Sequence, residues 1–503
     1  MGSRAGGFFV GLLPRIKYVM SQENQAMKHR RTKLIAFIVA LFYVGGIAAA
    51  MHAVMTVRTA QGAVAWSVSL VSFPFVALPA YLVLGRSKFD GMADAYEQSK
   101  DEIDALTSEF RQNMKPWAVP AEDDPSVYQS VRRLARMEMT HSNAAQLLIN
   151  GDATFSSILD GVAKAKDYVL FQFYMFHDDK LGRQVQEALI ERAKAGVRVY
   201  VLYDEVGSGG LPDIYVEKLR AAGVQVSSFK PSQGSRNRFQ LNFRNHRKMV
   251  VVDGVTAWVG GHNVGDEYMG RDPEFSPWRD THVRLDGPVA IQMQAVIVSD
   301  WYWATRELPE LNWQPQAAEG AAVNAMIVPF SPSSKLETAG LFFVTALNAA
   351  KHRIWLSAPY FVPDEAILKA LELAALRGVD VRVITTGKPD SWPVYLAAFR
   401  YIDHLLDLGI KFYSYEPGFL HEKVMLIDDH LSTVGTPNFD NRSFRLNFEV
   451  TALIADKAFA GEMEKMFEQD FAHAAIIDPA DLDDKPFWWR LAVNASRLAA
   501  PVL

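Results

Sequence analysis

The chain has 503 residues, of which 49% are hydrophobic, and its formal net charge is −5. This length allows more than one globular unit with a core of its own, and the negative balance argues against a general nucleic-acid binder. The absence of cysteine excludes disulfide bridges, thiolate nucleophiles and cysteine-ligated zinc.

Two long apolar segments lie near the amino terminus. Residues 34–55 and 64–84 each have about the 20 residues that a helix needs to cross a bilayer, and they carry almost no charge. A short link separates them, so the sequence predicts a two-helix transmembrane hairpin. A cleaved signal peptide and a pair of buried core helices are the alternatives. The length of both segments and the deep start of the first argue against them.

Basic residues flank this predicted hairpin. They are Lys28, Arg30, Arg31 and Lys33 before the first span, Arg58 in the link, and Arg86 and Lys88 after the second span. The excess of positive charge outside the link places both ends in the cytoplasm. Residues 1–33 are then a cytoplasmic amino-terminal segment, and residues 85–145 are a cytoplasmic linker to the rest of the chain.

The remainder of the chain contains two copies of one α/β unit, at residues 146–310 and 321–478. Each copy contains an amphipathic helix, an apolar strand, a second helix, a turn glycine and another apolar strand. This alternation predicts parallel or mixed sheets flanked by helices. Two similar domains without a common site would show the same repeat, so the position of the polar residues has to decide between the two arrangements.

Both copies carry the pattern H-x-K-x-x-x-x-D, followed by a glycine turn and an asparagine. The residues are His246, Lys248, Asp253 and Asn263 in the first copy, and His421, Lys423, Asp428 and Asn438 in the second. Residues two apart on a strand project from one face, so each histidine lies beside its lysine. One such pattern is common on a solvated strand end. Two patterns at corresponding positions of a repeat favour a shared function.

Paired imidazoles, ammonium groups and carboxamides suit a phosphodiester substrate. The lysines and asparagines would stabilise the charge of a pentacovalent transition state. One histidine would attack phosphorus, while the other would protonate the leaving alcohol and deprotonate the incoming one. We expect neither a metal ion nor a cofactor. The two aspartates that end the motifs are expected to hold the neighbouring loop or strand by hydrogen bonds.

The duplicated motif resembles the signature of the phospholipase D superfamily, over about residues 145–475. The resemblance implies two pseudo-symmetric units that share one active site, and it counts Asp253 and Asp428 among the catalytic residues. It also matches Asp280 and Glu449 to the acidic positions that orient the catalytic imidazoles. A surface strand charge is the alternative for either acid.

Longer stretches, from Asn245 to Gly270 and from His421 to Glu449, resemble bacterial cardiolipin synthases, as do the two amino-terminal spans. This resemblance implies phosphatidyl transfer between two phosphatidylglycerol molecules, donor and acceptor, giving cardiolipin and glycerol. It favours His246 as the nucleophile and implies the bacterial inner membrane for the predicted multi-pass protein. The predicted hairpin and the negative charge balance argue against a nucleic-acid partner. The alternatives are hydrolysis to phosphatidate, transfer to another alcohol, nuclease activity and a non-enzymatic scaffold, although a scaffold would not need two intact motifs. The oligomeric state does not follow from the sequence.

Two further features fit a lipid substrate. Arginines gather at the first motif, and they are candidates for holding an anionic head group, with a solvated loop charge as the alternative for each. These residues are Arg236, Arg238, Arg244 and Arg247. The tail, residues 479–503, sets Trp488 and Trp489 beside Arg490. This composition predicts an amphipathic helix at the membrane interface, or a helix docked on the catalytic units.

Overall fold

The computed structural model describes residues 12–85, 88–89, 91–120, 126–233 and 242–500. Contacts within the chain divide it into an N-terminal unit, residues 1–87, and a C-terminal unit that takes in the remaining chain apart from residues 239–242. Each unit has a hydrophobic core of its own.

The N-terminal unit contains the helices α1 Leu12–Thr56, α2 Ala60–Ser72 and α3 Pro74–Leu84. They pack around a small core that includes Ala53, Leu70 and Tyr81. A Cβ atom on Gly46 would lie 2.4 Å from the carbonyl oxygen of Leu70, so glycine permits the close contact of α1 with α2. Within the described residues, one helix, Met20–Thr56, is long and apolar enough to cross a membrane. It contains the first predicted span.

The second predicted span, residues 64–84, is divided between two helices. Phe73 ends α2 and precedes α3, with φ −132° and ψ 56°. Pro74 explains the break, because proline lacks an N–H group and its ring moves the preceding residue out of the helical conformation. Each helix alone is shorter than a bilayer requires. A hairpin of two membrane-spanning segments therefore stays a prediction.

The first copy of the repeat alternates strands with helices. Its main elements are β1 Thr140–Ile149, α7 Asn150–Lys164, β2 Tyr168–Phe173, α8 Lys180–Lys194, β3 Arg198–Asp204, α9 Asp213–Ala221, β4 Gln225–Phe229, β6 Met249–Val252, β7 Thr256–Gly260, β9 Thr281–Asp286 and α10 Val289–Thr305. Its strands lie in the order β4-β3-β2-β6-β7-β9-β1. Strands β2, β3 and β4 are parallel, and the remaining pairs are antiparallel.

The second copy repeats this arrangement. Its main elements are β10 Val323–Phe330, α11 Thr338–Ala349, β11 Arg353–Ser357, α12 Glu365–Leu376, β13 Asp380–Thr386, α13 Trp392–Leu406, β14 Lys411–Tyr415, β16 Val424–Ile427, β17 Leu431–Gly435, β19 Asn447–Ala455 and α15 Lys457–Ala472. The order β14-β13-β11-β16-β17-β19-β10 matches that of the first copy strand for strand.

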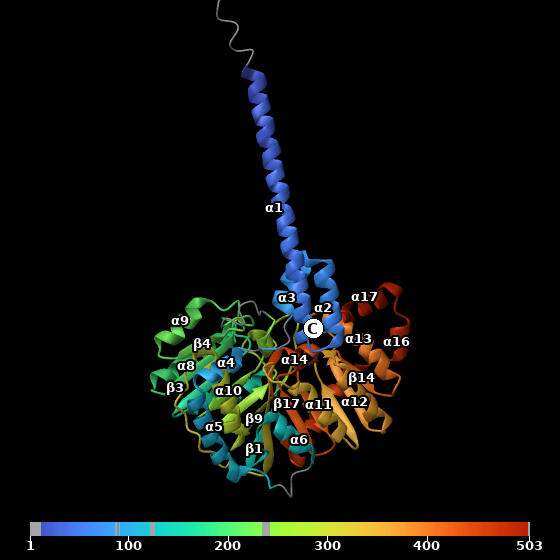
Figure 1. The fold of residues 1–503 in the computed structure, drawn as a ribbon. Helices are drawn as coiled ribbons and strands as arrows, with labels where there is room; N and C mark the ends of the chain where they lie inside the picture. The colour runs from blue at the N-terminus through green and yellow to red at the C-terminus, as the bar shows by residue number, and fades with distance from the viewer. Residues whose placement is uncertain (1–11, 86–87, 90, 121–125, 234–241, 501–503) are drawn as a thin grey trace, which may run out of the picture. The chain divides into compact units, whose positions relative to one another are not determined.

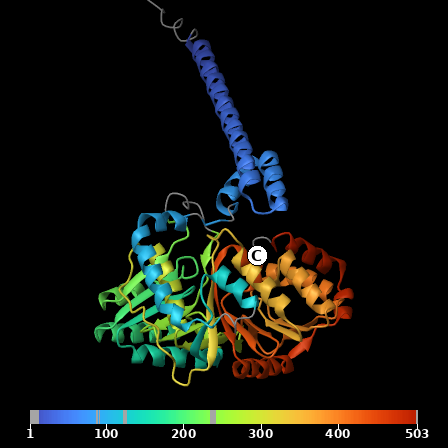
Figure 2. The ribbon, with the colours of Figure 1, turned by 60° about the horizontal axis from the view of Figure 1, so that its bottom comes forward.

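The two copies form one continuous sheet. Strand β1 pairs antiparallel with β10, and this pairing joins the two copies in a 16-stranded sheet. One edge strand of that sheet is β20 Ala474–Ile476. In Figures 1 and 2 the first copy, green to yellow, lies beside the second, orange to red. The prediction of a mixed sheet flanked by helices is confirmed.

Helices cover both faces of this sheet, and the alternation of side chains along each strand explains why. On β2, Val169 and Phe171 pack with α7, α8 and α9, whereas Tyr168 and Leu170 pack with α10. Every residue of β2 is buried, as expected of a strand enclosed on both faces. The core around α10 also contains residues of α15 in the second copy. The two copies therefore share a core as well as a sheet.

The segment predicted as a linker, residues 85–145, belongs to the C-terminal unit from Lys88 onward. Its helices are α4 Gly91–Gln98, α5 Lys100–Met114, η1 Lys115–Trp117 and α6 Ser126–Ala135. Phe89 and Met92 enter the core shared by the two copies, and Val131 enters the core of the second copy. Apolar residues spaced along these helices thus pack on the sheet instead of leaving a flexible connection.

Short elements complete the C-terminal unit. They are β5 Arg244–Asn245, η4 Asp266–Met269, β8 Trp278–Arg279, β12 Phe361–Val362, β15 Phe419–Leu420, β18 Phe439–Asp440, α14 Asn441–Arg445, α16 Pro479–Asp483 and α17 Phe487–Arg497. Two strand pairings among them connect the two copies next to the H-x-K motifs. Strand β5 of the first copy pairs with β19 of the second, and β8 pairs with β15.

Candidate active site

Each H-x-K motif lies in extended chain immediately before a central strand. His246 and Lys248 precede β6, and His421 and Lys423 precede β16. The Nζ atom of Lys248 donates a hydrogen bond to the carbonyl oxygen of His246 at 2.6 Å, and Lys423 donates in the same way to His421. Both lysines are buried. The short spacing of the motif therefore holds each ammonium group against the backbone of its histidine.

Each motif histidine contacts a carboxylate that belongs to the other copy. Nδ1 of His246, in the first copy, lies 3.0 Å from both carboxylate oxygens of Glu449 on β19 of the second copy. Nδ1 of His421, in the second copy, lies 2.8 Å from Oδ2 of Asp280 in the first. A carboxylate on Nδ1 fixes the proton there and leaves Nε2 as the free base. Neither Nε2 atom has a hydrogen-bond partner within the described residues.

Further contacts fix the two carboxylates. Thr436 donates its hydroxyl to Glu449 at 2.6 Å, and Asn447 donates its amide at 3.0 Å. Asp280 accepts the backbone N–H of Thr281 at 2.8 Å. A Cβ atom on Gly261 would lie 2.0 Å from the Asp280 carboxylate, so the glycine pair before Asn263 admits this acid. Both carboxylates are inaccessible to solvent.

Burial keeps both imidazoles neutral. It lowers the pKa of His246 to about 4, and the charge of Lys248 adds to this effect against the opposing influence of Glu449. Burial also lowers the pKa of His421 well below its usual value, with further lowering by the ammonium groups of Lys423 and Lys248. At neutral pH each Nε2 therefore carries a lone pair.

Lys423 influences the ionisation of Lys248 across the two copies. Burial lowers the pKa of Lys423 to about 8, while the carboxylates of Asp280 and Glu449 oppose the shift. Burial, together with the charge of Lys423, also lowers the pKa of Lys248 well below its ordinary value. Two ammonium groups that repel one another in a dry site favour a bound anion.

Both motif asparagines are buried and keep one amide atom unpaired. Asn263 lies 2.6 Å from the hydroxyl of Tyr268, whose ring contacts His421. Among the described residues, the Oδ1 atoms of Asn263 and Asn438 have no hydrogen-bond partner. If the Asn263 amide is turned by 180°, it accepts the Tyr268 proton and presents Nδ2 as an unpaired donor. A buried unpaired donor beside two ammonium groups suits the oxygen of a phosphate.

Aromatic side chains surround the histidines, and the sequence motifs did not identify them. The ring of Tyr174 lies 4.9 Å from that of His246, and Lys248 Nζ lies 5.2 Å from the Tyr174 ring centre. The ring of Trp278 lies 5.1 Å from that of His421. The GDEYMG stretch after Asn263 and the WRD stretch before β9 mark two of these positions, Tyr268 and Trp278. No comparable pattern marks Tyr174.

The residue between histidine and lysine points to the opposite side of the chain. Arg247 donates to the Asp300 carboxylate of α10 at 2.6 Å, to the Glu449 carbonyl at 3.1 Å and to the Phe330 carbonyl at 2.9 Å. These bonds engage its Nε, Nη1 and Nη2 atoms. The prediction that Arg247 holds a lipid head group at the motif is therefore wrong, because alternation sends its side chain toward α10.

The other predicted arginines have different outcomes. Arg236 and Arg238 lie outside the described residues. Arg244, on β5, donates to the carbonyl oxygen of Phe243 and influences the ionisation of Tyr174. Arg442 of α14 influences the same tyrosine. A head-group role for Arg244 stays a prediction.

In the second copy, Glu422 takes the place of Arg247. Its carboxylate lies 3.0 Å from the Arg279 guanidinium, which also forms a bidentate pair with Asp470 of α15 at 2.7 and 2.6 Å. Burial raises the pKa of Glu422 to about 7, while the charge of Arg279 opposes the shift. A buried ion pair thus lies beneath each motif, on the side of α10 and α15.

The motif aspartates contact backbone groups at the other end of the central strands. Asp253 accepts the N–H groups of Lys166, Asp167 and Tyr168 at 2.8–2.9 Å. Asp428 accepts the three N–H groups that lead into β11 at 2.8–3.2 Å. The expectation that they hold a neighbouring loop or strand is confirmed. These contacts give both aspartates a structural role, and their catalytic role stays an untested prediction from the family signature.

One cluster of potential metal ligands occurs elsewhere among the described residues. His177, Asp179 and Glu267 place ligand atoms within 4.8 Å of one another. These side chains are partly exposed and already bonded, since Asp179 caps α8 and Glu267 contacts His177. The cluster contains neither motif histidine.

Comparisons with known proteins identify the family of this chain. Residues 158–278 and 343–471 match the family model described as "Cardiolipin synthase, PLD-like domain". A cardiolipin synthase A of Pseudomonas fluorescens is 47% identical over 475 residues, which cover 93% of this chain and 98% of that protein. One from Pseudomonas putida is 44% identical over 483 residues, covering 95% and 100% of the two chains. The chain belongs to the cardiolipin synthase family.

Members of the cardiolipin synthase family are phosphatidyltransferases of the phospholipase D superfamily, and the resemblance predicted from the duplicated motif is confirmed. A third relative, a cardiolipin synthase A of Pseudomonas aeruginosa, is 46% identical and covers 91% of this chain and 94% of its own. Among solved structures, the phosphatidylserine synthase of Haemophilus influenzae is similar, with a TM-score of 0.56 and 12% identity over 75% of this chain and 100% of that protein. That likeness supports the fold.

Proposed function

We propose that this cardiolipin synthase family member transfers a phosphatidyl group from one phosphatidylglycerol to a second, giving cardiolipin and glycerol, at one catalytic centre made by both copies. The observation that carries the proposal is that each histidine contacts an acid of the other copy, His246 with Glu449 and His421 with Asp280. Because each imidazole depends on an acid of the other copy, neither copy contains a complete histidine–carboxylate pair.

In the first step, Nε2 of His246 attacks the phosphorus of the donor lipid. The bond from phosphorus to the glycerol head group breaks, and His421 delivers a proton to the departing glycerol oxygen. The product is a phosphatidyl–histidine. The family resemblance supports this division of roles. A bound phosphodiester brings negative charge next to His421, which raises the pKa of that imidazole toward the range in which it can carry the proton.

In the second step, the terminal hydroxyl of another phosphatidylglycerol attacks the phosphatidyl–histidine. His421 accepts the hydroxyl proton, and the phosphorus–nitrogen bond to His246 breaks, which restores both side chains. Lys248, Lys423 and the two motif asparagines would hold the non-bridging oxygens through both steps. Water in place of the second lipid would give phosphatidate, so productive transfer requires the acceptor to exclude water.

We further propose that the protein lies in the bacterial inner membrane, with the C-terminal unit in the cytoplasm. The apolar part of α1 would form one span. Helices α2 and α3 together would return through the bilayer, since Val68, Phe73 and Val76 expose apolar surface. Basic residues on both outer flanks of these segments support this orientation.

The tail supplies a candidate membrane contact on the C-terminal unit itself. Helix α17 docks on α13, with Val493 buried and the ring of Trp489 5.1 Å from that of Phe399. Its other side exposes Phe487 and Trp488. The two interpretations of the tail are therefore compatible, since one face of α17 packs on the unit and the other would enter the interface.

The test is to incubate the full chain, purified in detergent, with phosphatidylglycerol labelled in the glycerol head group and in an acyl chain. We expect cardiolipin and free glycerol in a 1:1 ratio, and loss of both in His246→Ala and His421→Ala. His473→Ala, at an exposed histidine, is the matched control and should retain activity. Phosphatidate in place of cardiolipin would indicate a hydrolase, and unchanged phosphatidylglycerol would reject the donor lipid.

A further inference from the structure

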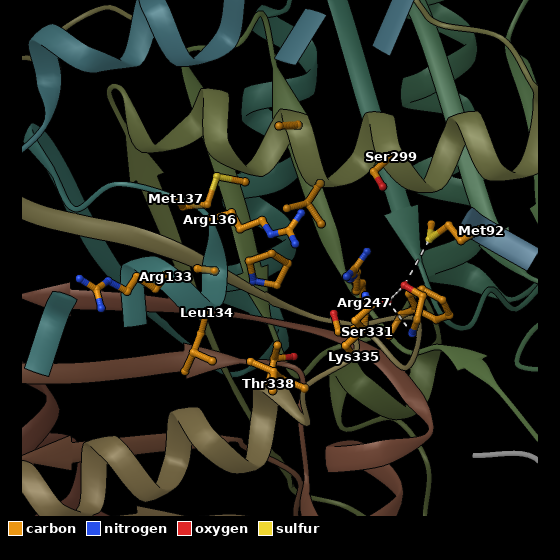
Figure 3. Close-up of a pocket in the computed structure, with 18 of the residues that line it drawn as sticks. Met92, Arg133, Leu134, Arg136, Met137, Arg247, Ser299, Ser331, Lys335 and Thr338 are labelled. Carbon is orange, nitrogen blue, oxygen red and sulfur yellow. Dashed lines mark hydrogen bonds between the residues drawn. The ribbon is translucent and has the colours of Figure 1, made fainter. Parts of the chain in front are cut away.

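A large cavity lies on the α10 side of the first motif. Its volume is about 750 Å³, and its walls come from α4, α6, α10 and the chain between β10 and α11 (Figure 3). Arg247 lines it, whereas His246 and Lys248 point to the opposite side of the same extended chain. The cavity is therefore separate from the histidine pair.

The lining of the cavity is positively charged. Arg133, Arg136 and Lys335 contribute cationic side chains, and no ion pair joins them to another described residue. In Figure 3 the guanidinium groups of Arg136 and Arg247 lie toward the middle of the view and that of Arg133 at one edge. No described acidic side chain lines the cavity, and Asp300 neutralises Arg247 alone. Cations gathered without a counter-charge attract an anion.

The positive region continues onto the adjoining surface. Arg133 and Arg136 also line a neighbouring hollow, together with Arg111 and Arg132. Glu138, the one acidic side chain among the described residues that line it, pairs with Arg132. The hollow therefore adds positive charge beside the cavity, and an anionic ligand would be attracted from either opening.

An apolar compartment adjoins the cationic one. It has a volume of about 300 Å³ and shares Tyr96, Arg136 and Met137 with the larger cavity. Leu106 and Phe110 of α5 line its interior, and other apolar side chains from α10 and the chain after it complete the wall. Both volumes fall within the range of small-ligand sites, about 300–1,000 Å³. Cationic and apolar compartments that share part of their walls match a molecule with an anionic head and a hydrocarbon chain.

We propose that these adjacent cavities bind an anionic phospholipid at a second, non-catalytic site, with its phosphate among Arg133, Arg136 and Lys335 and part of one acyl chain beside Leu106 and Phe110. An inorganic phosphate would leave the apolar compartment unfilled, and a zwitterionic lipid would leave the cations without a net counter-charge. The site goes beyond the transfer reaction, because no residue of the histidine pair lines it.

Photo-crosslinking tests this proposal directly. The full chain is reconstituted in phosphatidylcholine nanodiscs that contain phosphatidate with a diazirine at the end of one acyl chain. Phosphatidate has no head-group alcohol to lose, so it is not consumed as a donor. After irradiation, peptide mapping should locate the label on α5, at or near Leu106 and Phe110. The label should persist in the double variant His246→Ala/His421→Ala.

Charge reversal separates a specific site from general contact with lipid. Arg133→Glu/Arg136→Glu should reduce the α5 label by about tenfold or more, the equivalent of roughly 1.4 kcal/mol in binding. Lys194→Glu/Lys218→Glu, at exposed lysines of α8 and α9, is the matched control and should leave it unchanged. Three results would each overturn the proposal. Diazirine-bearing phosphatidylcholine could label α5 equally, inorganic phosphate at millimolar concentration could displace the label, or the signal could be unchanged in the Arg133/Arg136 variant. An unchanged melting temperature establishes that the variants are folded.

Discussion

Each motif histidine has one ring nitrogen bound to a buried carboxylate and the other without a partner in the described part of the chain. For His246 the carboxylate is Glu449, whose two oxygens also accept bonds from Thr436 and Asn447. Burial alone raises the pKa of Glu449, but the neighbouring His246 and Lys248 outweigh it and keep the acid ionised. The charge on this acid fixes the tautomer of the imidazole and stabilises the positive ring that forms when Nε2 reacts.

Glu449→Gln should preserve the shape of this contact while removing its charge. We expect kcat to fall by about 10²- to 10⁴-fold, because an amide no longer stabilises the charged ring or enforces one tautomer. Asp280→Asn should have an effect of similar size at His421. The rate of cardiolipin formation measures the loss of kcat, and the melting temperature shows whether each variant is folded. A loss of less than about threefold with an intact fold would show that the carboxylates do not orient the imidazoles.

The lowered pKa of Lys423 predicts an alkaline limit to activity. Lys423 is cationic below its folded pKa of about 8 and loses its charge as the pH rises through that value. In the proposed reaction phosphate binding depends on that charge, so kcat/KM should decline above about pH 8. Lys423→Arg should move the decline upward, since a guanidinium stays protonated. A profile that is flat to pH 10 in the unmodified enzyme would contradict this assignment.

At the scale of elements, each central strand connects the site to a fixed turn. Strand β6 carries the motif lysine at one end and Asp253 at the other, and β16 has the same arrangement with Asp428. Both aspartates have a positive φ, 54° and 53°, a region that aspartate and asparagine tolerate better than most residues. Their carboxylates hold the chain that leads into β2 and β11. The repeated spacing of the motif therefore fixes the register of the central strand as well as the position of the histidine and lysine at its end.

Asp253→Asn should affect stability more than catalysis. Asparagine tolerates the positive φ, but without the charge the three N–H bonds weaken, and we expect a loss of about 1–2 kcal/mol of folding free energy. That corresponds to a fall of a few degrees in melting temperature. At a temperature where the variant is folded, kcat/KM should remain within about tenfold of the unmodified value.

Asp160→Asn provides the control for this variant. Asp160 forms an exposed i,i+4 pair with Lys164 on α7, which contributes little to stability. Its melting temperature should be unchanged. If Asp253→Asn instead abolishes transfer while its melting temperature holds, the catalytic role that the family signature gives this aspartate would be supported.

At the scale of the whole C-terminal unit, the two copies cannot be separated without dividing the site. They share a continuous sheet through β1 and β10 and a common core around α10 and α15. Both histidine–carboxylate contacts cross from one copy to the other. Each chain therefore contains all the groups that the proposed reaction requires.

Mixing two inactive variants tests whether one chain suffices. If the site is completed within a chain, His246→Ala and His421→Ala proteins that are purified separately and then mixed should show no more cardiolipin synthesis than either alone. The same result is expected after co-reconstitution in one nanodisc. Recovery toward about a quarter of the unmodified rate, the value for random exchange in a 1:1 mixture, would mean that copies are exchanged between chains.

The sequence by itself determined the repeat, the mixed-sheet fold and the family, because strand periodicity and fixed spacing are local properties that the chain carries wherever it folds. It also placed His246 beside Lys248, and His421 beside Lys423, since residues two apart share a face. It did not predict the break at Phe73 in the second span, although Pro74 supplied the signal, and it did not predict that residues 85–145 pack on the sheet.

Only the tertiary structure decided which acid serves which histidine. Asp280 and His421 lie far apart in the chain and in different copies, and pairing between β8 and β15 brings them together. Burial, which lowers the pKa values of the site, is likewise a property of the assembled unit. Alternation alone puts Arg247 on the face opposite to His246. That this face meets α10 and the anion cavity depends on how the chain packs between two helical layers. Long-range packing sets these features, and no local pattern in the sequence encodes them.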